Sequence, residues 1–180
     1  MHRHRGLTFI ELLVTATLIT ILSISSVPAF TALVMDLRMT SQVNGFVHAF
    51  HLAKQASQQL FTEVAVCKSP DGIQCDAKKT WADGWIAFVN TNQDHPPRVT
   101  QGERILAVGA AFESGTITAN RQHFIFRPFE VRSTNGTLTF CDRRGVDQAR
   151  AVVLSYTGRP RVVRQVVLQN AGGPPPVCPS

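Results

Sequence analysis

The chain has 180 residues, which is enough for one ordinary domain and an accessory element but not for two independent cores. Apolar residues make up 44% and charged residues 17% of the composition, which excludes a disordered tail, and only 12 glycines and 10 prolines exclude a collagen-like chain. The net charge of +6 favours anionic partners such as nucleic acid or lipid headgroups without choosing between them.

The N-terminal segment is typical of a membrane anchor. Residues 1–6 are basic, and residues 7–27 are largely apolar and carry one charge, Glu11. As a helix, this apolar segment would rise about 32 Å, the thickness of a bilayer's hydrocarbon core. The basic start predicts a cytoplasmic N-terminus and places the chain after residue 30 outside the cytoplasm. A cleaved secretory signal is the alternative, but its apolar region is typically about 7–15 residues and ends at an A-x-A-like site.

Glu11 is the one charge within this apolar segment. An ionised carboxylate in a membrane helix costs about 2.5–3.5 kcal/mol at the helix centre unless it is paired. No lysine or arginine lies between Leu7 and Asp36, so a cationic partner would come from another subunit or from a newly made terminal amine. The alternative is a carboxylate near the interface that reaches headgroup water.

The string RGLTFIELL at residues 5–13 resembles the class III signal of type IV pilins and type II secretion pseudopilins, with Leu7 in place of the usual phenylalanine. The resemblance implies cleavage by a prepilin peptidase after Gly6 and methylation of the new amino group of Leu7. It also implies that Glu11 pairs with the terminal amine of a neighbouring subunit. Pro28 matches the family's proline partway along this helix and permits a kink.

Beyond Pro28 the pattern predicts that the helix continues to about residue 61. Apolar side chains recur at steps of three and four residues from Phe30 to Leu60, so one stripe faces a core. His48 and His51 lie on neighbouring turns without a visible third ligand, and we interpret them as ordinary surface histidines.

The remainder of the chain predicts an antiparallel β-sheet packed on the second half of the helix, an α+β fold. Turn signals such as Asn135-Gly136 separate short β-prone runs. These runs cover residues 62–67, 84–90, 104–109, 123–127, 136–141, 150–156 and 161–168. The final residues 171–180 are rich in proline and are expected to form an extended tail.

Four cysteines lie in the segment placed outside the cytoplasm, where disulfides are the default. Three pairings are possible. Cys67 and Cys75 flank a short turn and should pair first, which leaves Cys141 for Cys178. A structural zinc site is the alternative, but the spacings lack the close pairs that such a site uses.

No enzymatic motif is present. The sequence contains no GxSxG, HExxH or P-loop pattern, so we expect neither catalysis nor a cofactor nor a metal. Asp142 and Asp147 flank arginines and are expected to form surface pairs. Trp85 is expected in the core, whereas Trp81 is left open between core and a stacking platform.

The C-terminal half carries most of the positive charge. From residue 91 onward there are eleven arginines, no lysine and six acids. The densest part is residues 158–164, where Gly158 permits a positive φ and Pro160 stiffens the chain. Arg159 and Arg161 are two residues apart and would point the same way from an extended strand, as suits phosphate binding. The alternative is a solubilising turn whose arginines point into water.

Four segments of the domain resemble the GspH/FimT family of minor type IV pilins and type II secretion pseudopilins. They are CKSPDGIQC (67–75), WADGWIAFVN (81–90), GTLTFCD (136–142) and RAVVLSYTGRPR (150–161). Residues 158–161 match the GRxR motif of FimT-like minor pilins, which implies DNA binding for uptake in natural transformation. The motif implies that Gly158, Arg159 and Arg161 take part in DNA binding. Arg164 is added to these candidate DNA-binding residues because it is close to them in the sequence.

The resemblance implies a type IV pilin-like organisation of five parts. These are a leader (1–6), a transmembrane and filament-core helix (7–30), its continuation against the sheet (31–61), a periplasmic β-rich domain (62–170) and the tail. The expected partners are other pilins, the prepilin peptidase, the inner membrane and the DNA backbone, with export into an extracellular pilus after assembly. Two alternatives remain: a pseudopilin of a type II secretion system without a DNA role, and a purely architectural pilus-tip subunit.

Overall fold

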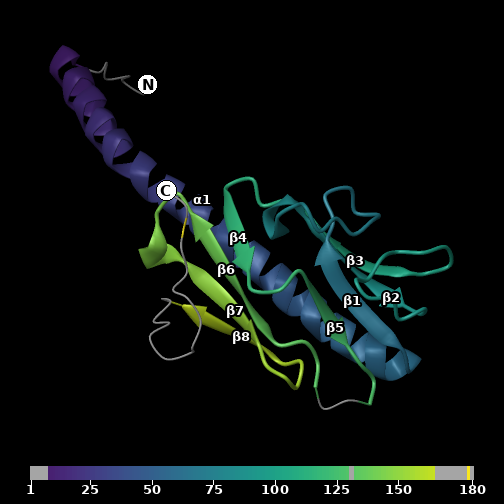
Figure 1. The fold of residues 1–180 in the computed structure, drawn as a ribbon. Helices are drawn as coiled ribbons and strands as arrows, with labels where there is room; N and C mark the ends of the chain where they lie inside the picture. Colours follow the sequence, from purple (N-terminus) through teal and green to yellow (C-terminus); the bar gives the residue numbers. More distant parts are fainter. Residues whose placement is uncertain (1–7, 130–131, 165–177, 179–180) are drawn as a thin grey trace, which may run out of the picture. The chain divides into compact units, whose positions relative to one another are not determined.

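The computed structural model describes residues 8–129, 132–164 and 178. It divides into two compact units, residues 1–37 and 38–180. Helix α1 (Phe9–Leu60) begins in the first unit and ends in the second, which confirms the expected long helix (Figure 1). The helix passes Pro28 without ending.

The first unit is a helical segment that is long and apolar enough to cross a membrane, with a mean hydropathy of 2.0 in its most apolar window. Its hydroxyl side chains fold back onto the helix. Thr20 Oγ1 donates to the Ala16 carbonyl and Ser23 Oγ to the Ile19 carbonyl, each at 2.8 Å. These bonds satisfy polar groups that would otherwise be costly in hydrocarbon.

The helix starts at a capping pair. The Glu11 backbone N–H donates to Thr8 Oγ1 at 3.3 Å, and the Leu12 N–H donates to the Thr8 carbonyl at 3.2 Å. Thr8 and Glu11 have the spacing of a capping box, which places the Glu11 carboxylate in the positively polarised first turn. Gly6 and Leu7, expected at the cleavage point, lie outside the described residues.

The second unit contains two four-stranded antiparallel sheets rather than one. The first sheet has the order β3 (Ile105–Gly109), β2 (Trp85–Asn90), β1 (Glu63–Lys68), β5 (His123–Phe126). The second has the order β4 (Gly115–Ala119), β6 (Gly136–Asp142), β7 (Arg150–Leu154), β8 (Pro160–Arg164). Strand β4 was not predicted, because its five residues include no long apolar run. Residues 165–168 and most of the expected tail lie outside the described residues.

Both sheets share one core with the second half of α1. The helix contributes its stripe of buried residues, and each sheet contributes its facing side chains. Phe46 lies at the centre, with its ring centroid 5.0 Å from Trp85, 5.8 Å from Trp81 and 5.5 Å from Phe140. The expectation for Trp85 is confirmed. Trp81 is also buried, and its Nε1 donates to the Arg121 carbonyl at 3.0 Å, so it is not a stacking platform.

Two disulfides are present, Cys67–Cys75 and Cys141–Cys178, in the expected pairing. The first closes a loop next to β1. The second ties the end of β6 to the last segment of the chain across 37 residues. Together they constrain both sheets covalently.

Asp142 differs from the expected surface pair. Its side chain is only 2% exposed, and Arg144 binds it with Nε and Nη2, the latter at 2.7 Å. Burial alone would raise the pKa of Asp142, but the hydrogen bonds and charge of Arg144 hold it below its usual range. Asp142, the last residue of β6, is the buried member of the pair, whereas the side chain of Arg144 is 18% exposed.

Two turn carboxylates predict how the stability of the domain depends on pH. Hydrogen bonds from the Thr80 N–H and hydroxyl hold the pKa of Asp83 below 3.8, and those from the Gln74 N–H and its neighbours do the same for Asp71. Because the folded-state pKa values lie below the unfolded ones, this stabilisation is present above pH 3.8 and is lost as the pH falls through the folded-state values. The contribution of these two carboxylates, measured by urea unfolding as the difference between the parent and a variant without them, should change little between about pH 7 and pH 5 and fall towards pH 3.

The matched variant replaces both carboxyls, Asp71→Asn with Asp83→Asn. It should be less stable than the parent at neutral pH and should lose less on acidification. Equal acid sensitivity in both proteins would contradict this account.

Candidate nucleic-acid interface

The candidate site is the hairpin formed by β7 and β8. A three-residue loop, Tyr156 to Gly158, joins the strands. The Gly158 N–H donates to the Ser155 carbonyl at 2.9 Å, and the Ser155 N–H donates to the Arg159 carbonyl at 3.2 Å. With φ +75° at Gly158, this is a three-residue hairpin loop that ends in a glycine of positive φ.

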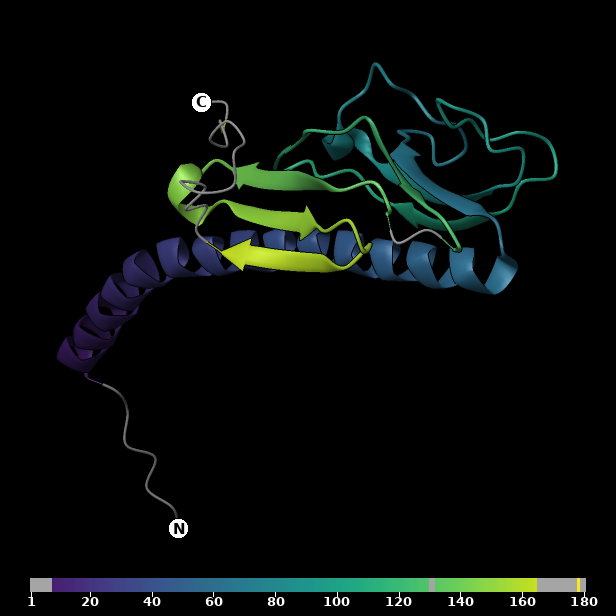
Figure 2. The same cartoon turned by 60° about the horizontal axis from the view of Figure 1, so that its bottom comes forward.

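Glycine at 158 is required for a second reason, because the loop lies directly against the domain. A Cβ there would lie 3.0 Å from Ser133 Oγ, 3.3 Å from Lys54 Cδ and 3.4 Å from Phe126 Cδ1. The Ser133 N–H also donates to the Tyr156 carbonyl at 2.7 Å. Figure 2 shows this loop beside the segment that connects β5 to β6. Arg159 therefore projects from a backbone that is held in place.

The strand register separates the arginines that follow. Val162 pairs with the core residue Val152, whereas Arg161 pairs with Val153 and Arg164 with Arg150. Since side chains alternate along a strand, Arg161 and Arg164 lie on opposite faces of β8. Arg159 precedes β8, so the strand alternation that would align it with Arg161 does not apply to it.

Residues 121–164 contain nine arginines and three acids. Several of these arginines have partners: Arg121 binds Asn135, Arg127 binds Glu63, and Arg150 donates to Thr40 Oγ1. Within the described part of the chain, four arginines of this region make no side-chain hydrogen bond or ion pair: Arg132, Arg159, Arg161 and Arg164. Each is exposed. These four guanidiniums keep all their donors available for an anion.

Arg150 and Arg164 are directly opposite each other on neighbouring strands. Like charges at such positions repel, but Arg150 is engaged by its hydrogen bond to Thr40 Oγ1. Arg164 is the member of this pair whose guanidinium is left for an anion.

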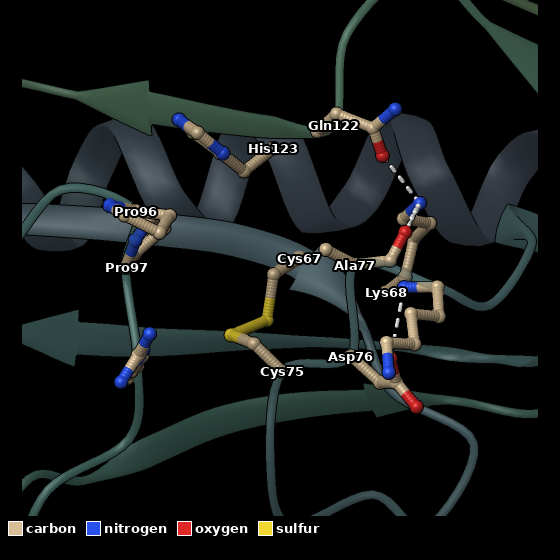
Figure 3. A pocket seen from close by; sticks show the side chains of 11 residues that line it. Cys67, Lys68, Cys75, Asp76, Ala77, Pro96, Pro97, Gln122 and His123 are labelled. Carbon is tan, nitrogen blue, oxygen red and sulfur yellow. Dashed lines mark hydrogen bonds between the residues drawn. A yellow bond between two sulfur atoms is a disulfide. The ribbon is translucent and has the colours of Figure 1, made fainter.

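A pocket of about 470 Å³ lies elsewhere in the second unit, beside the Cys67–Cys75 disulfide (Figure 3). Lys68 is buried at its wall and donates to the Ala77 carbonyl at 2.7 Å and to Gln122 Oε1. Burial lowers the pKa of Lys68, and the charges of Asp76 and Asp83 partly counter that effect. The ammonium group joins the segment that follows Cys75 to the residue that precedes β5, so its role is structural.

His123 lines the same pocket (Figure 3). Its burial, with the nearby charges of His95 and Arg121, lowers its pKa and favours the neutral ring. The cations left to this pocket are Lys78 and Arg98, which share it with the carboxylate of Asp76.

Sequence reasoning identified Gly158, Arg159, Arg161 and Arg164 but missed Arg132 and Lys54. Neither residue lies in a motif. Arg132 lies near the hairpin because its neighbour Ser133, in the β5–β6 segment, donates to the Tyr156 carbonyl. Lys54 lies near it because helix α1 passes the loop at Gly158. Neither arrangement is visible in the local sequence.

The fold is that of a type IV pilin. Two crystal structures of the type IV minor pilin FimU of Pseudomonas aeruginosa PAO1 are similar to it, with TM-scores of 0.51 and 0.50 at 14% and 15% identity. The matches cover 70% and 71% of this chain and 93% and 89% of the FimU chains.

A family model described as type II transport protein GspH matches residues 42–158, more than half of the sequence. The chain belongs to the GspH family, as the sequence motifs predicted. No curated protein matches it. Membership of this pilin and pseudopilin family implies assembly with other pilins, and the apolar helix fits anchoring in the inner membrane.

Proposed function

We propose that this protein is a minor type IV pilin that binds DNA non-specifically through the β7–β8 hairpin, for uptake in natural transformation. The main support for the proposal is the loop at Gly158, which packs against the domain and exposes Arg159. Arg161 and Arg164 follow in β8, and neither side chain has a partner among the described residues. A guanidinium offers phosphate a planar fork of donors. Contacts of this kind position a nucleic acid without reading its bases, so no sequence preference is expected.

Assembly would use the N-terminal segment. Cleavage by the prepilin peptidase after Gly6 removes the leader (1–6) and exposes the amine of Leu7, which pairs with Glu11 of a neighbouring subunit. The helix 7–30 then lies in the membrane or the filament core, and residues 31–61 and 62–170 form the periplasmic part. The exposed Glu11 in the first helical turn and the two disulfides support this arrangement.

The second candidate is a pseudopilin of a type II secretion system, a structural subunit without a DNA role. The description of the matching family model, type II transport protein, favours it. A deletion strain separates the two. Loss of transformation with normal protein secretion supports the pilin, and the reverse supports the pseudopilin.

Replacing Arg159 and Arg161 with alanine should weaken DNA binding and its salt dependence. Each phosphate contact contributes about 0.7–0.9 to the slope of log affinity against log salt, so the double variant should lose about 1.4–1.8 from that slope. The measurement is fluorescence anisotropy of a labelled DNA fragment against the full chain in a neutral detergent, over a series of salt concentrations.

The matched control replaces Arg98 and Arg104, two exposed arginines of the first sheet's loops, with alanine. It removes the same charge and should leave the slope nearly unchanged. An equal loss in both variants would mean that only net charge matters, and absence of binding by the parent at low salt would remove the proposed function.

A further inference from the structure

Two phenylalanines are stacked on the surface at the end of helix α1. Phe61 is 68% and Phe129 79% exposed, and their rings lie 5.5 Å apart at an interplanar angle of 20°. Phe61 also has φ +53°, at a position just past the helix where glycine is usual. Both the exposure of two aromatic rings and this backbone conformation cost free energy, and neither serves the core.

The stacked pair is connected to the hairpin loop through Lys54. Lys54 Cδ lies against Gly158, and its Nζ donates to the Arg127 carbonyl at 3.4 Å. Phe129 follows Arg127 by two residues, at most about 7 Å of chain. The aromatic pair and the arginine-bearing loop therefore belong to one surface of the second unit.

A third exposed aromatic lies on the loop itself. Tyr156 is 59% exposed, and its carbonyl accepts the hydrogen bond from Ser133, the neighbour of Arg132. Two of the three exposed aromatics precede an unpartnered arginine by three residues: Tyr156 precedes Arg159, and Phe129 precedes Arg132. Each of these two rings therefore has an arginine close to it in the chain.

We propose that this surface binds single-stranded DNA, with bases stacked on Tyr156 and on the Phe61–Phe129 pair and phosphates held by Arg132 and Arg159. This inference rests on the proposed function and names its substrate. Aromatic platforms beside cations are the usual means of holding a single strand, because every base has a π face. In a duplex those faces are covered by the neighbouring base pairs, so the aromatic rings add affinity for an open strand.

The test compares a labelled oligothymidylate with a duplex of equal length, each bound to the full chain in a neutral detergent. Replacing Tyr156 and Phe129 together with alanine should weaken single-strand binding by about thirtyfold or more, since two stacked bases are lost, and should change duplex binding less than about twofold. Phe129→Trp should retain single-strand binding, and its added fluorescence should be quenched when the base stacks. Ile73→Ala, at an exposed apolar residue of the disulfide loop, is the matched control and should change neither affinity.

Each other outcome overturns the inference. If duplex binding depends on Arg159 and Arg161 while the aromatic variant binds single strands as the parent does, the aromatic platform is wrong and the proposed function stands. If the aromatic variant binds both DNA forms normally but fails to assemble into filaments, the pair is a contact between subunits. If the parent binds no DNA, the proposed function fails and this inference fails with it.

Discussion

Replacing Phe46 with alanine should lower the free energy of unfolding by about 3–5 kcal/mol, the usual cost of deleting a fully buried aromatic ring. Phe46 is 0% exposed, and its ring contacts Phe50, Trp81, Trp85 and Phe140. These neighbours come from the helix, the first sheet and the second sheet. The cavity would therefore lie where the three layers meet, and no single element can close it by moving.

Urea unfolding of the full chain in a neutral detergent measures the loss. Phe30→Ala is the control, because Phe30 is an exposed aromatic of the same helix in the first unit, and its replacement should change the unfolding free energy by less than about 0.5 kcal/mol. A loss below about 1 kcal/mol for Phe46→Ala would contradict the central position assigned to this ring.

Removing the Cys141–Cys178 disulfide should cost about 2–4 kcal/mol of unfolding free energy. The matched variant removes Cys67–Cys75 and should cost about 1 kcal/mol less, because the loop it closes is shorter and constrains the unfolded chain less. Both variants carry serine at the two cysteine positions, so that no free thiol remains. Unfolding of the two by urea under identical conditions gives the difference directly.

DNA binding should survive the loss of Cys141–Cys178. The loop that presents Arg159 is held by Ser133 and by the close approach of Gly158, neither of which involves Cys178. A larger loss of stability for the short bridge would contradict the argument from loop length, and a loss of DNA binding without the long bridge would show that the tail contributes to the site.

The sequence predicted the elements better than their arrangement. Apolar spacing from Phe30 to Leu60 was sufficient for the helix, and turn residues bounded seven of the eight strands. It could not show that the strands divide into two sheets, because pairing depends on contacts between residues far apart in the chain. The sequence left Trp81 undecided and placed Asp142 at the surface for the same reason: each is covered by a segment that no local pattern identifies.

For the site, the motif at residues 158–161 identified the loop and its arginines. The packing of Gly158 against Lys54 and the position of Arg132 could not be predicted from the sequence. The helix, the β5–β6 segment and the hairpin come together only when the chain folds. The neighbouring aromatic rings carry no motif. An exposed phenylalanine cannot be distinguished from a buried one by its identity alone.

The way in which the loop is held has a kinetic consequence. The loop is attached to the domain by one backbone hydrogen bond from Ser133 and by the close packing of Gly158. The strands behind it, β7 and β8, are paired along their whole length. Local opening of the tip therefore requires far less free energy than global unfolding. We therefore expect backbone hydrogen exchange to be faster at the tip of the arginine loop than in the strands behind it, with both sheets intact.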